Sequence, residues 1–385
     1  MLRPGTMNQA YGNPGIAVSL MGSLSPTLYS GDLYDNNTGV IVPLNQAHRG
    51  ALWAFCSSKE FYQAVRRLDQ KMNVTNATLV KVPFDLEHWQ KVADEMGPLP
   101  EPYSEDPTQW LFKGHPERST LPLLVAVTRL VGYRWPEQEE DGLAAYADQD
   151  GIVCLPPVGG ERPAAERLRD LLVAAYGDAW TPETLDALLV EVGYGGKTLA
   201  DWLRDGFFTQ HSKLFHQRPF IWHVWDGRKD GFSALVNYHK LDKALLERLT
   251  YTVLGDWIAR QRHAMGQQEA GSDARLVAAL ELQKKLELIL AGEGYPDANP
   301  PHGYDIFVRW KPLPQQPLGW EPNLNDGVRL NIRPFMTADI LRARPNIKWG
   351  IDRGKNPPGA PWGEERDNDR HLTLAEKTAG RDTAK

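Results

Sequence analysis

The stretch PLPEPYSEDPTQW, residues 98–110, contains four prolines and limits how this chain can fold. Proline fixes φ and lacks an N–H, so neither a long helix nor a central strand runs through such a stretch. Short apolar runs separated by turn residues come before it, and apolar residues at helical spacing follow it. We therefore expect a small α+β domain over 1–115 and a mainly helical domain over 116–292.

The sequence of residues 1–115 predicts a β-rich lobe that also contains helices. Turn residues separate three short apolar runs, which predict strands over 15–24, 26–34 and 38–44. Helical spacing over 48–70 is interrupted by two serines, and the second serine is placed to start a new helix. A further strand over 77–85 and a short amphipathic helix over 86–96 complete this lobe.

The second part predicts helices around one β-hairpin. The hairpin, within 218–240, has apolar runs on either side of the turn GRKDG. Thr181 and Pro182 are typical of a helix start, with proline at the first helical position. Helices are expected over 119–135, 162–177, 181–193, 198–217, 242–265 and 272–291. The last segment, 293–385, is rich in loop residues, and the predicted fold class is α+β.

Bulk composition fits a protein with an ordinary core. The chain has 42% hydrophobic and 24% charged residues, and no apolar run approaches the ~20 residues that span a membrane. Two cysteines, Cys56 and Cys154, do not make a disulfide framework, so we expect a reduced, cytoplasmic setting without a secretion leader or a membrane. The net charge of −6 argues against a wholly basic nucleic-acid coat but leaves room for local basic patches.

Two short motifs imitate catalytic or phosphate-binding loops. Asn356-Pro357-Pro358 looks like the loop of adenine-N6 methyltransferases, but a polar GIDRGK segment precedes it and Gly359 stands where an aromatic residue would stack on the base. Gly196-Lys197-Thr198 looks like a phosphate loop, but Glu191 occupies the position of its first glycine. We interpret the first as a surface loop and the second as a helix-ending turn before a new helix.

The sequence supports no catalytic residue and no metal site. His211 and His216 lie five apart rather than at ligand spacing, and neither cysteine has a nearby ligand partner. No glycine-rich turn that would bind a nucleotide cofactor follows a predicted strand. We therefore expect this chain alone to be catalytically inactive.

Four longer phrases carry a family resemblance. Residues 28–89 (LYSGDLYDNN to PFDLEHW) resemble the target-recognition region of adenine-N6 DNA methyltransferases of type II restriction-modification, BREX and DISARM systems, and the recognition domains of type I specificity subunits. In those proteins a small β-rich lobe precedes a helix and a "valine-proline" strand. The other three phrases follow in the order seen near the carboxyl end of BREX and DISARM enzymes: 218–258, 323–335 (NLNDGVRLNIRPF) and 370–377 (RHLTLAEK).

The resemblance implies a part of an enzyme rather than a whole one. Members of the family carry a nucleotide-binding domain before this region, so S-adenosylmethionine and the catalytic loop would lie upstream of Met1, and we expect no cofactor in this chain. A truncated gene, a split reading frame or a separate subunit would each account for a chain that corresponds to only part of such an enzyme. The implied partner is duplex DNA in a restriction-modification or phage-defence system, with a separate methyltransferase chain or other defence proteins as further partners.

Local cations and amides are candidates for DNA contact. Lys and Arg hold phosphates through counterion release, and Asn pairs with adenine. The predicted DNA-binding residues come from the first lobe and from the hairpin: Asn36, Asn37, Arg66, Arg67, Lys71, Asn76, Arg218, Arg228, Lys229 and Lys240. Arg333, Arg342, Arg344, Lys348, Arg353 and Lys355 add charge near the carboxyl end.

Each candidate also has a structural interpretation. A charge run on a helix is usually a solvated face, and Asp226 and Asp230 flank a turn that they would shape. Trp222 and Trp225 fit a core better than a base-stacking platform. The chain is therefore either a DNA-binding recognition module or a protein-interaction subunit that binds no DNA, and salt-dependent binding to duplex DNA separates the two.

Overall fold

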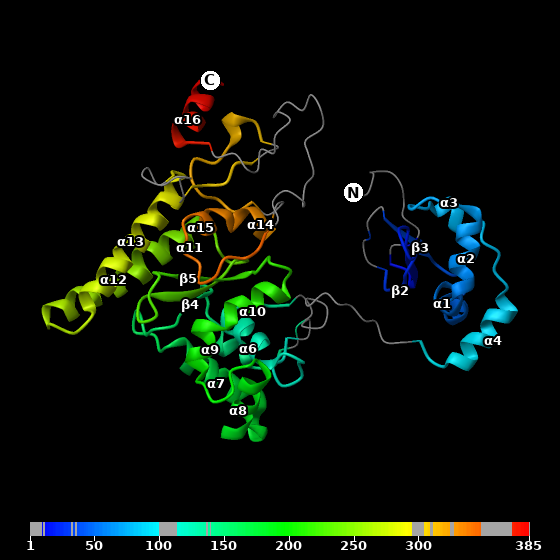
Figure 1. The fold of residues 1–385 in the computed structure, drawn as a ribbon, viewed down its shortest axis with the longest axis horizontal. Helices are drawn as coiled ribbons and strands as arrows, with labels where there is room; N and C mark the ends of the chain where they lie inside the picture. The colour runs from blue at the N-terminus through cyan, green and yellow to red at the C-terminus, as the bar shows by residue number, and fades with distance from the viewer. Residues whose placement is uncertain are drawn as a thin grey trace. The chain divides into compact units, whose positions relative to one another are not determined.

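A computed structural model of the chain divides it into two compact units, Met1–Glu105 and Asp106–Lys385 (Figure 1). The fold is α+β with a helical majority, as predicted, and each unit contains a three-stranded antiparallel sheet. The boundaries predicted at 115 and 292 stay predictions. The structure describes residues 10, 12–31, 34, 37–99, 114–135, 138, 140–294, 304–308, 311–323, 327–347 and 372–384.

The sheet of the first unit has the order β2-β1-β3. Its strands confirm the three predicted ones: β1 Gly15–Ser19, β2 Pro26–Tyr29 and β3 Thr38–Ile41. Ile16 and Val18 of the central strand are fully buried against the helices, whereas Ala17 faces the other side with Tyr29. This alternation is the period-2 pattern of a strand with different neighbours on its two faces.

Helices cover one face of that sheet: η1 Gln46–His48, α1 Arg49–Cys56, α2 Lys59–Leu68, α3 Asn76–Leu79 and α4 Leu86–Met96. The predicted break between α1 and α2 is confirmed, because the Ser58 hydroxyl accepts a hydrogen bond from the Phe61 N–H at 3.0 Å and caps α2. The predicted strand over 77–85 is wrong. That segment forms the short α3 and a turn, because the N–H groups of Leu79 and Val80 donate to the Thr75 and Asn76 carbonyls, at 3.3 and 3.2 Å, instead of to a neighbouring strand.

The sheet of the second unit has the order β4-β6-β5, formed by β4 Ile152–Cys154, β5 Ile221–Trp225 and β6 Ser233–Asn237. Strands β5 and β6 confirm the predicted hairpin, and Trp222 pairs with Val236 across it. β4 was not predicted. The outer edge of β5 is covered by residues 340–342, since the Trp225 N–H donates to the Ile340 carbonyl at 3.0 Å.

Helices surround this sheet and supply most of its core. Fully buried Trp202, Trp222, Trp320 and Phe335 belong to one continuous cluster, so residues beyond 293 pack with the middle of the chain. The helices are α6 Pro122–Leu130, α7 Ala164–Tyr176, α8 Pro182–Glu191, α9 Leu199–Asp205, α10 Phe207–Leu214, α11 Lys243–Glu247, α12 Leu254–Gly266, α13 Ser272–Ala291, α14 Gly327–Asn331, α15 Arg333–Thr337 and α16 Leu374–Asp382. The 3₁₀ helices of this unit are η2 Leu143–Tyr146, η3 Gly177–Ala179 and η5 Leu313–Gln315, and η4 Arg248–Val253 is a π-helix.

Two helix predictions had different outcomes. The start of α8 is as predicted, because the Thr181 hydroxyl accepts the Thr184 N–H at 3.3 Å and Pro182 occupies the first helical position. The single helix predicted over 198–217 is wrong, since α9 and α10 meet at Gly206. A Cβ at Gly206 would lie 2.5 Å from the Tyr194 ring, so the close approach of Tyr194 favours glycine at this junction.

Candidate nucleic-acid interface

One end of the first unit gathers most of the residues predicted there. Arg66, near the carboxyl end of α2, donates to the Gly22 carbonyl at 2.6 Å and also to the Lys71 carbonyl. These bonds join α2 to the β1–β2 turn and to the segment after α2. An antiparallel bridge joins Met21 and Asn73, and α3 contacts α2 (Figure 1). We call this region, residues 66–81 with the β1–β2 turn, the α2 end.

Three exposed cations lie at the α2 end: Arg67, Lys71 and Lys81. None of them forms an ion pair with the part of the chain that the structure describes. The nearby Asp69 instead accepts the Lys71 N–H at 3.0 Å and the Thr78 hydroxyl at 3.2 Å, and so shapes the turn. This leaves a local excess of positive charge on an acidic protein, which is what a phosphate backbone requires.

The amide side chains reach the same end from the sheet side. Asn76 begins α3 and is exposed, and its side-chain oxygen would lie 2.8 Å from a Cβ at Gly39 in β3. Asn37 immediately precedes β3, and its carbonyl accepts the Leu20 N–H at 2.7 Å. Asn36 lies outside the described residues. The structure therefore brings Asn37 and Asn76 to one end of the unit with Arg66, Arg67 and Lys71.

Hairpin residues are not gathered in this way. Arg228 and Lys229 lie in the β5–β6 turn, whereas Arg218 and Lys240 lie at the other end of the hairpin. Five strand residues separate the two pairs, about 17 Å of extended chain. Lys240 donates to the carbonyls of Asp148 at 2.9 Å and Gln149 at 2.8 Å, so it fastens a loop within the second unit.

The β5–β6 turn also carries less free charge than its sequence suggests. Arg228 donates two hydrogen bonds to Asp230, at 3.0 and 3.2 Å, and the guanidinium holds the pKa of that carboxyl below its usual range. Asp226 accepts the Arg228 and Phe232 N–H groups at 3.0 and 2.7 Å, and burial raises its pKa. Both aspartates shape the turn, as interpreted from the sequence, and Lys229 remains the exposed cation without an ion pair in the described part of the chain.

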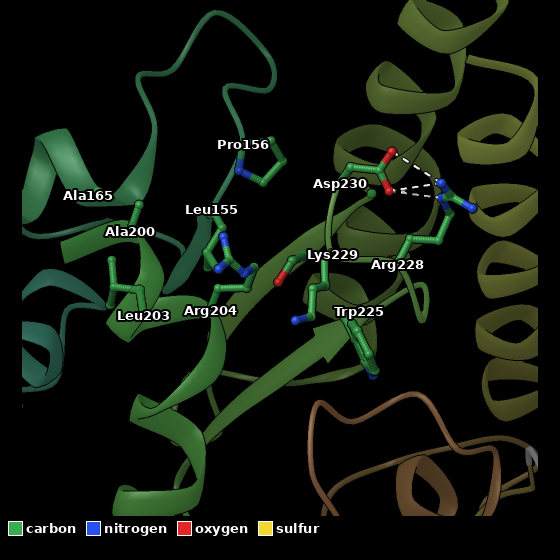
Figure 2. Close-up of a pocket in the computed structure, with 12 residues that line it drawn as sticks. Leu155, Pro156, Ala165, Ala200, Leu203, Arg204, Trp225, Arg228, Lys229 and Asp230 are labelled. Atoms are coloured by element: carbon green, nitrogen blue, oxygen red, sulfur yellow. Dashed lines mark hydrogen bonds and ion pairs between the residues drawn. The ribbon is translucent and has the colours of Figure 1, made fainter. Parts of the chain in front are cut away.

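A cavity of about 200 Å³ lies beside this turn, between the turn, the loop after β4 and helix α9. Arg204 from α9 and Lys229 extend toward the same space, and Arg228 points away toward Asp230 (Figure 2). Trp225 forms one wall, and the Arg342 guanidinium lies 4.2 Å from the centre of its ring. Trp222, by contrast, is fully buried, as expected of a core residue.

The other sequence motifs were tested where the structure describes them. Gly196-Lys197-Thr198 is a helix-ending turn, as interpreted: the Thr198 hydroxyl accepts the Asp201 N–H at 3.1 Å and starts α9. Asn356-Pro357-Pro358 and Gly359, with Lys348, Arg353 and Lys355, lie outside the described residues. Within the described ranges no three His, Cys, Asp or Glu side chains gather as metal ligands, and no helix is long and apolar enough to cross a membrane.

Sequence reasoning missed Lys81 and Arg204 as members of these sites. Lys81 falls within the strand predicted over 77–85, but it lies in the turn that follows α3 instead. Arg204 lies in a helix that shows no signal beyond ordinary amphipathic spacing. It reaches the cavity only because α9 packs beside the hairpin, and no local pattern encodes that contact.

No family model matches the chain. Over 109 residues the chain is 29% identical to adenine-specific methyltransferase PglX from Lacticaseibacillus casei (strain Zhang). The match covers 27% of this chain and 9% of that protein. It supports a loose relationship to an adenine-specific methyltransferase.

Proposed function

We propose that this chain is a DNA-binding module associated with an adenine-specific DNA methyltransferase, and that its α2 end contacts the phosphate backbone. The observation that carries the proposal is the convergence of Arg67, Lys71 and Lys81, without ion pairs in the described chain, beside the exposed Asn76. The similarity to adenine-specific methyltransferase PglX supports the choice of DNA as the partner. In this proposal S-adenosylmethionine is bound by a methyltransferase domain other than the residues of this chain.

The proposed interface combines the two kinds of contact that DNA-binding proteins use. Cations at the α2 end would position the module on phosphates, and the amides of Asn37 and Asn76 would contact base edges. Arg66 would act indirectly, because its hydrogen bonds to Gly22 and Lys71 hold the α2 end together. Whether the hairpin faces the same groove stays a prediction.

A second candidate function is docking to a separate methyltransferase chain. It is favoured by exposed apolar side chains at the same α2 end, including Met72, which is 75% exposed, and Val80, which is 83% exposed. Exposed apolar groups rimmed by polar residues often mark protein contacts. A docking surface of this kind would bind its partner with little dependence on salt.

The test is fluorescence anisotropy of labelled duplex DNA at low salt with matched variants. Arg67→Ala and Lys71→Ala each remove an exposed cation and should weaken binding about equally for all duplex sequences, since phosphates carry no sequence information. Lys91→Ala is the control, because Lys91 on α4 is exposed but already pairs with Glu87 at 3.3 Å. Equal affinity of all three variants and the wild type would refute the α2 end as the interface.

A further inference from the structure

The cavity beside the β5–β6 turn has the size of a site for a small group rather than a large cofactor. Its volume is about 200 Å³, below the roughly 300–1,000 Å³ typical of drug-sized ligands. Leu155 and Leu203 line one side and the hairpin turn lines the other. It lies entirely in the second unit, so what it binds does not depend on the proposed role of the α2 end.

Two cations supply donors that the protein does not use. Lys229 is exposed and forms no ion pair with the described residues. Arg204 is held on one side by Asp201 at 2.8 Å and by Asp205 at 2.7 Å, through its Nε and Nη2 atoms. Its Nη1 donates no hydrogen bond to the described chain, so a guanidinium fixed on its other side keeps two N–H groups for a ligand in the cavity that Arg204 and Lys229 both line (Figure 2).

A buried serine adds a third donor to the cavity wall. The Ser233 hydroxyl lies 2.5 Å from Nε2 of His223, and Nδ1 of that ring is buried without a partner in the described chain. Burial lowers the His223 pKa to about 3, so the ring is neutral at pH 7 and carries one N–H. An unpaired buried acceptor is tolerated better than an unpaired donor. The ring proton therefore belongs on Nε2, and the serine keeps its own O–H to donate into the cavity.

Trp225 forms an aromatic wall, and the Asp230 carboxylate, which also lines the cavity, is paired with Arg228 and Arg275. Trp225 is half-buried at the end of β5, and Arg342 stacks on its ring while donating to Asp205 at 2.8 Å. The carboxylate of Asp205 thus fixes Arg204 and Arg342 together. Donors that are already oriented lose little freedom when a ligand binds, which favours a specific site over a diffuse charge.

We propose that this cavity is a binding site for a phosphate monoester, with the phosphate held by Arg204 Nη1, Lys229 Nζ and Ser233 Oγ. Phosphate oxygens accept several charge-assisted hydrogen bonds at once, and a guanidinium matches their geometry. The cavity is large enough for the phosphate group itself, and the Trp225 ring suits contact with the adjoining part of the ester. The phosphate can come from a free nucleotide or from the 5′ end of a DNA strand, since both present the same group.

Isothermal titration calorimetry of the full chain tests the site with three probes: inorganic phosphate, adenosine 5′-monophosphate, and a single-stranded oligonucleotide with or without a 5′-phosphate. Saturable one-site binding of the monophosphate is expected. Preference for the phosphorylated over the unphosphorylated oligonucleotide would assign the strand end as the source, and binding of the free nucleotide alone would assign a small-molecule ligand.

Variants locate the binding. Lys229→Ala should raise the dissociation constant about tenfold, the effect of one charge-assisted hydrogen bond. Lys229→Arg should retain most of the affinity. Lys213→Ala is the matched control, because Lys213 is exposed on α10 and does not line the cavity. The proposal is overturned if the wild type binds none of the phosphate probes, or if Lys229→Ala binds as tightly as Lys213→Ala. Loss of duplex DNA binding in α2-end variants would leave this result unchanged.

Discussion

Arg228 donates two hydrogen bonds to Asp230, so the two most prominent charges of the β5–β6 turn neutralise each other. Asp230 also lies 3.7 Å from Arg275 on α13, which holds the carboxylate from a second side. Lys229, between the two partners in sequence, is left exposed. Arg228 and Lys229 are both cationic and adjacent, but only Lys229 keeps its positive charge free to bind an external anion.

This difference predicts unequal effects on DNA binding by the hairpin. Lys229→Ala should lower the slope of log affinity against log salt by about 1, the contribution of one phosphate contact. Arg228→Ala should leave that slope nearly unchanged, because its charge is already compensated by Asp230. Anisotropy titrations from low to moderate salt measure both slopes. An equal decrease in the salt slope for the two variants would contradict this prediction and show that the Arg228–Asp230 ion pair opens when DNA binds.

Arg66 is predicted to contribute more to the stability of the fold than to the charge available for binding DNA. Arg66→Ala removes the hydrogen bonds to the Gly22 and Lys71 carbonyls and should lower the free energy of unfolding by about 1–2 kcal/mol. Arg67→Ala, one residue along the same helix, should change it by less than about 0.5 kcal/mol, since it is exposed and contacts no partner in the described chain. Urea denaturation of both variants checks the contrast, and equal midpoints would contradict it.

A buried ion pair in the second unit gives a test by single and double substitution. Lys377 of α16 donates to Asp305, and both side chains are only 1% exposed. Asp305→Ala should cost about 3–5 kcal/mol, because it leaves a buried charge without its partner. The double variant Asp305→Leu with Lys377→Leu should recover much of that loss. A double variant less stable than the single one would contradict this account.

Two buried histidines predict acid sensitivity. Burial lowers the pKa of His211 and of His223 from 6.5 to about 3. Between these values the unfolded chain binds protons that the folded chain does not, so stability is complete above pH 6.5 and falls as the pH drops toward 3. From pH 6.5 to 5 each histidine should cost about 2 kcal/mol. Denaturation of the wild type and His223→Gln at several pH values measures this, and an unchanged pH slope in the variant would refute it.

How far the sequence predicts this fold depends on whether an element is encoded locally. The β5–β6 hairpin and the start of α8 were predictable, because alternation around GRKDG and the Thr181-Pro182 pair act within a few residues. β4 was not, since its three residues become a strand only by pairing with β6, far along the chain. The segment 77–85 has β-prone composition but folds as α3 and a turn, because its backbone N–H groups bond locally, as Leu79 does to Thr75 and Val80 to Asn76.

Residues of the candidate sites were likewise predictable only where the signal lies within a few residues of sequence. Arg67 and Lys71 were found because a basic run on one helix end is visible in sequence. The pairing of Arg228 with Asp230 was not foreseen, although the two residues are only two apart. Arg204 and Ser233 were missed because α9 and β6 meet at the cavity through tertiary packing alone.

Salt dependence of wild-type binding to duplex DNA, measured by anisotropy, tests the central claim most directly. Log affinity should fall linearly with log salt, with about −3 of the slope from Arg67, Lys71 and Lys81 on phosphates and about −1 more from Lys229. Binding should be strongest at the lowest ionic strength, where screening is weakest. No detectable binding at low salt, or an affinity that does not change with salt, would contradict the DNA-binding role and favour docking to a protein partner.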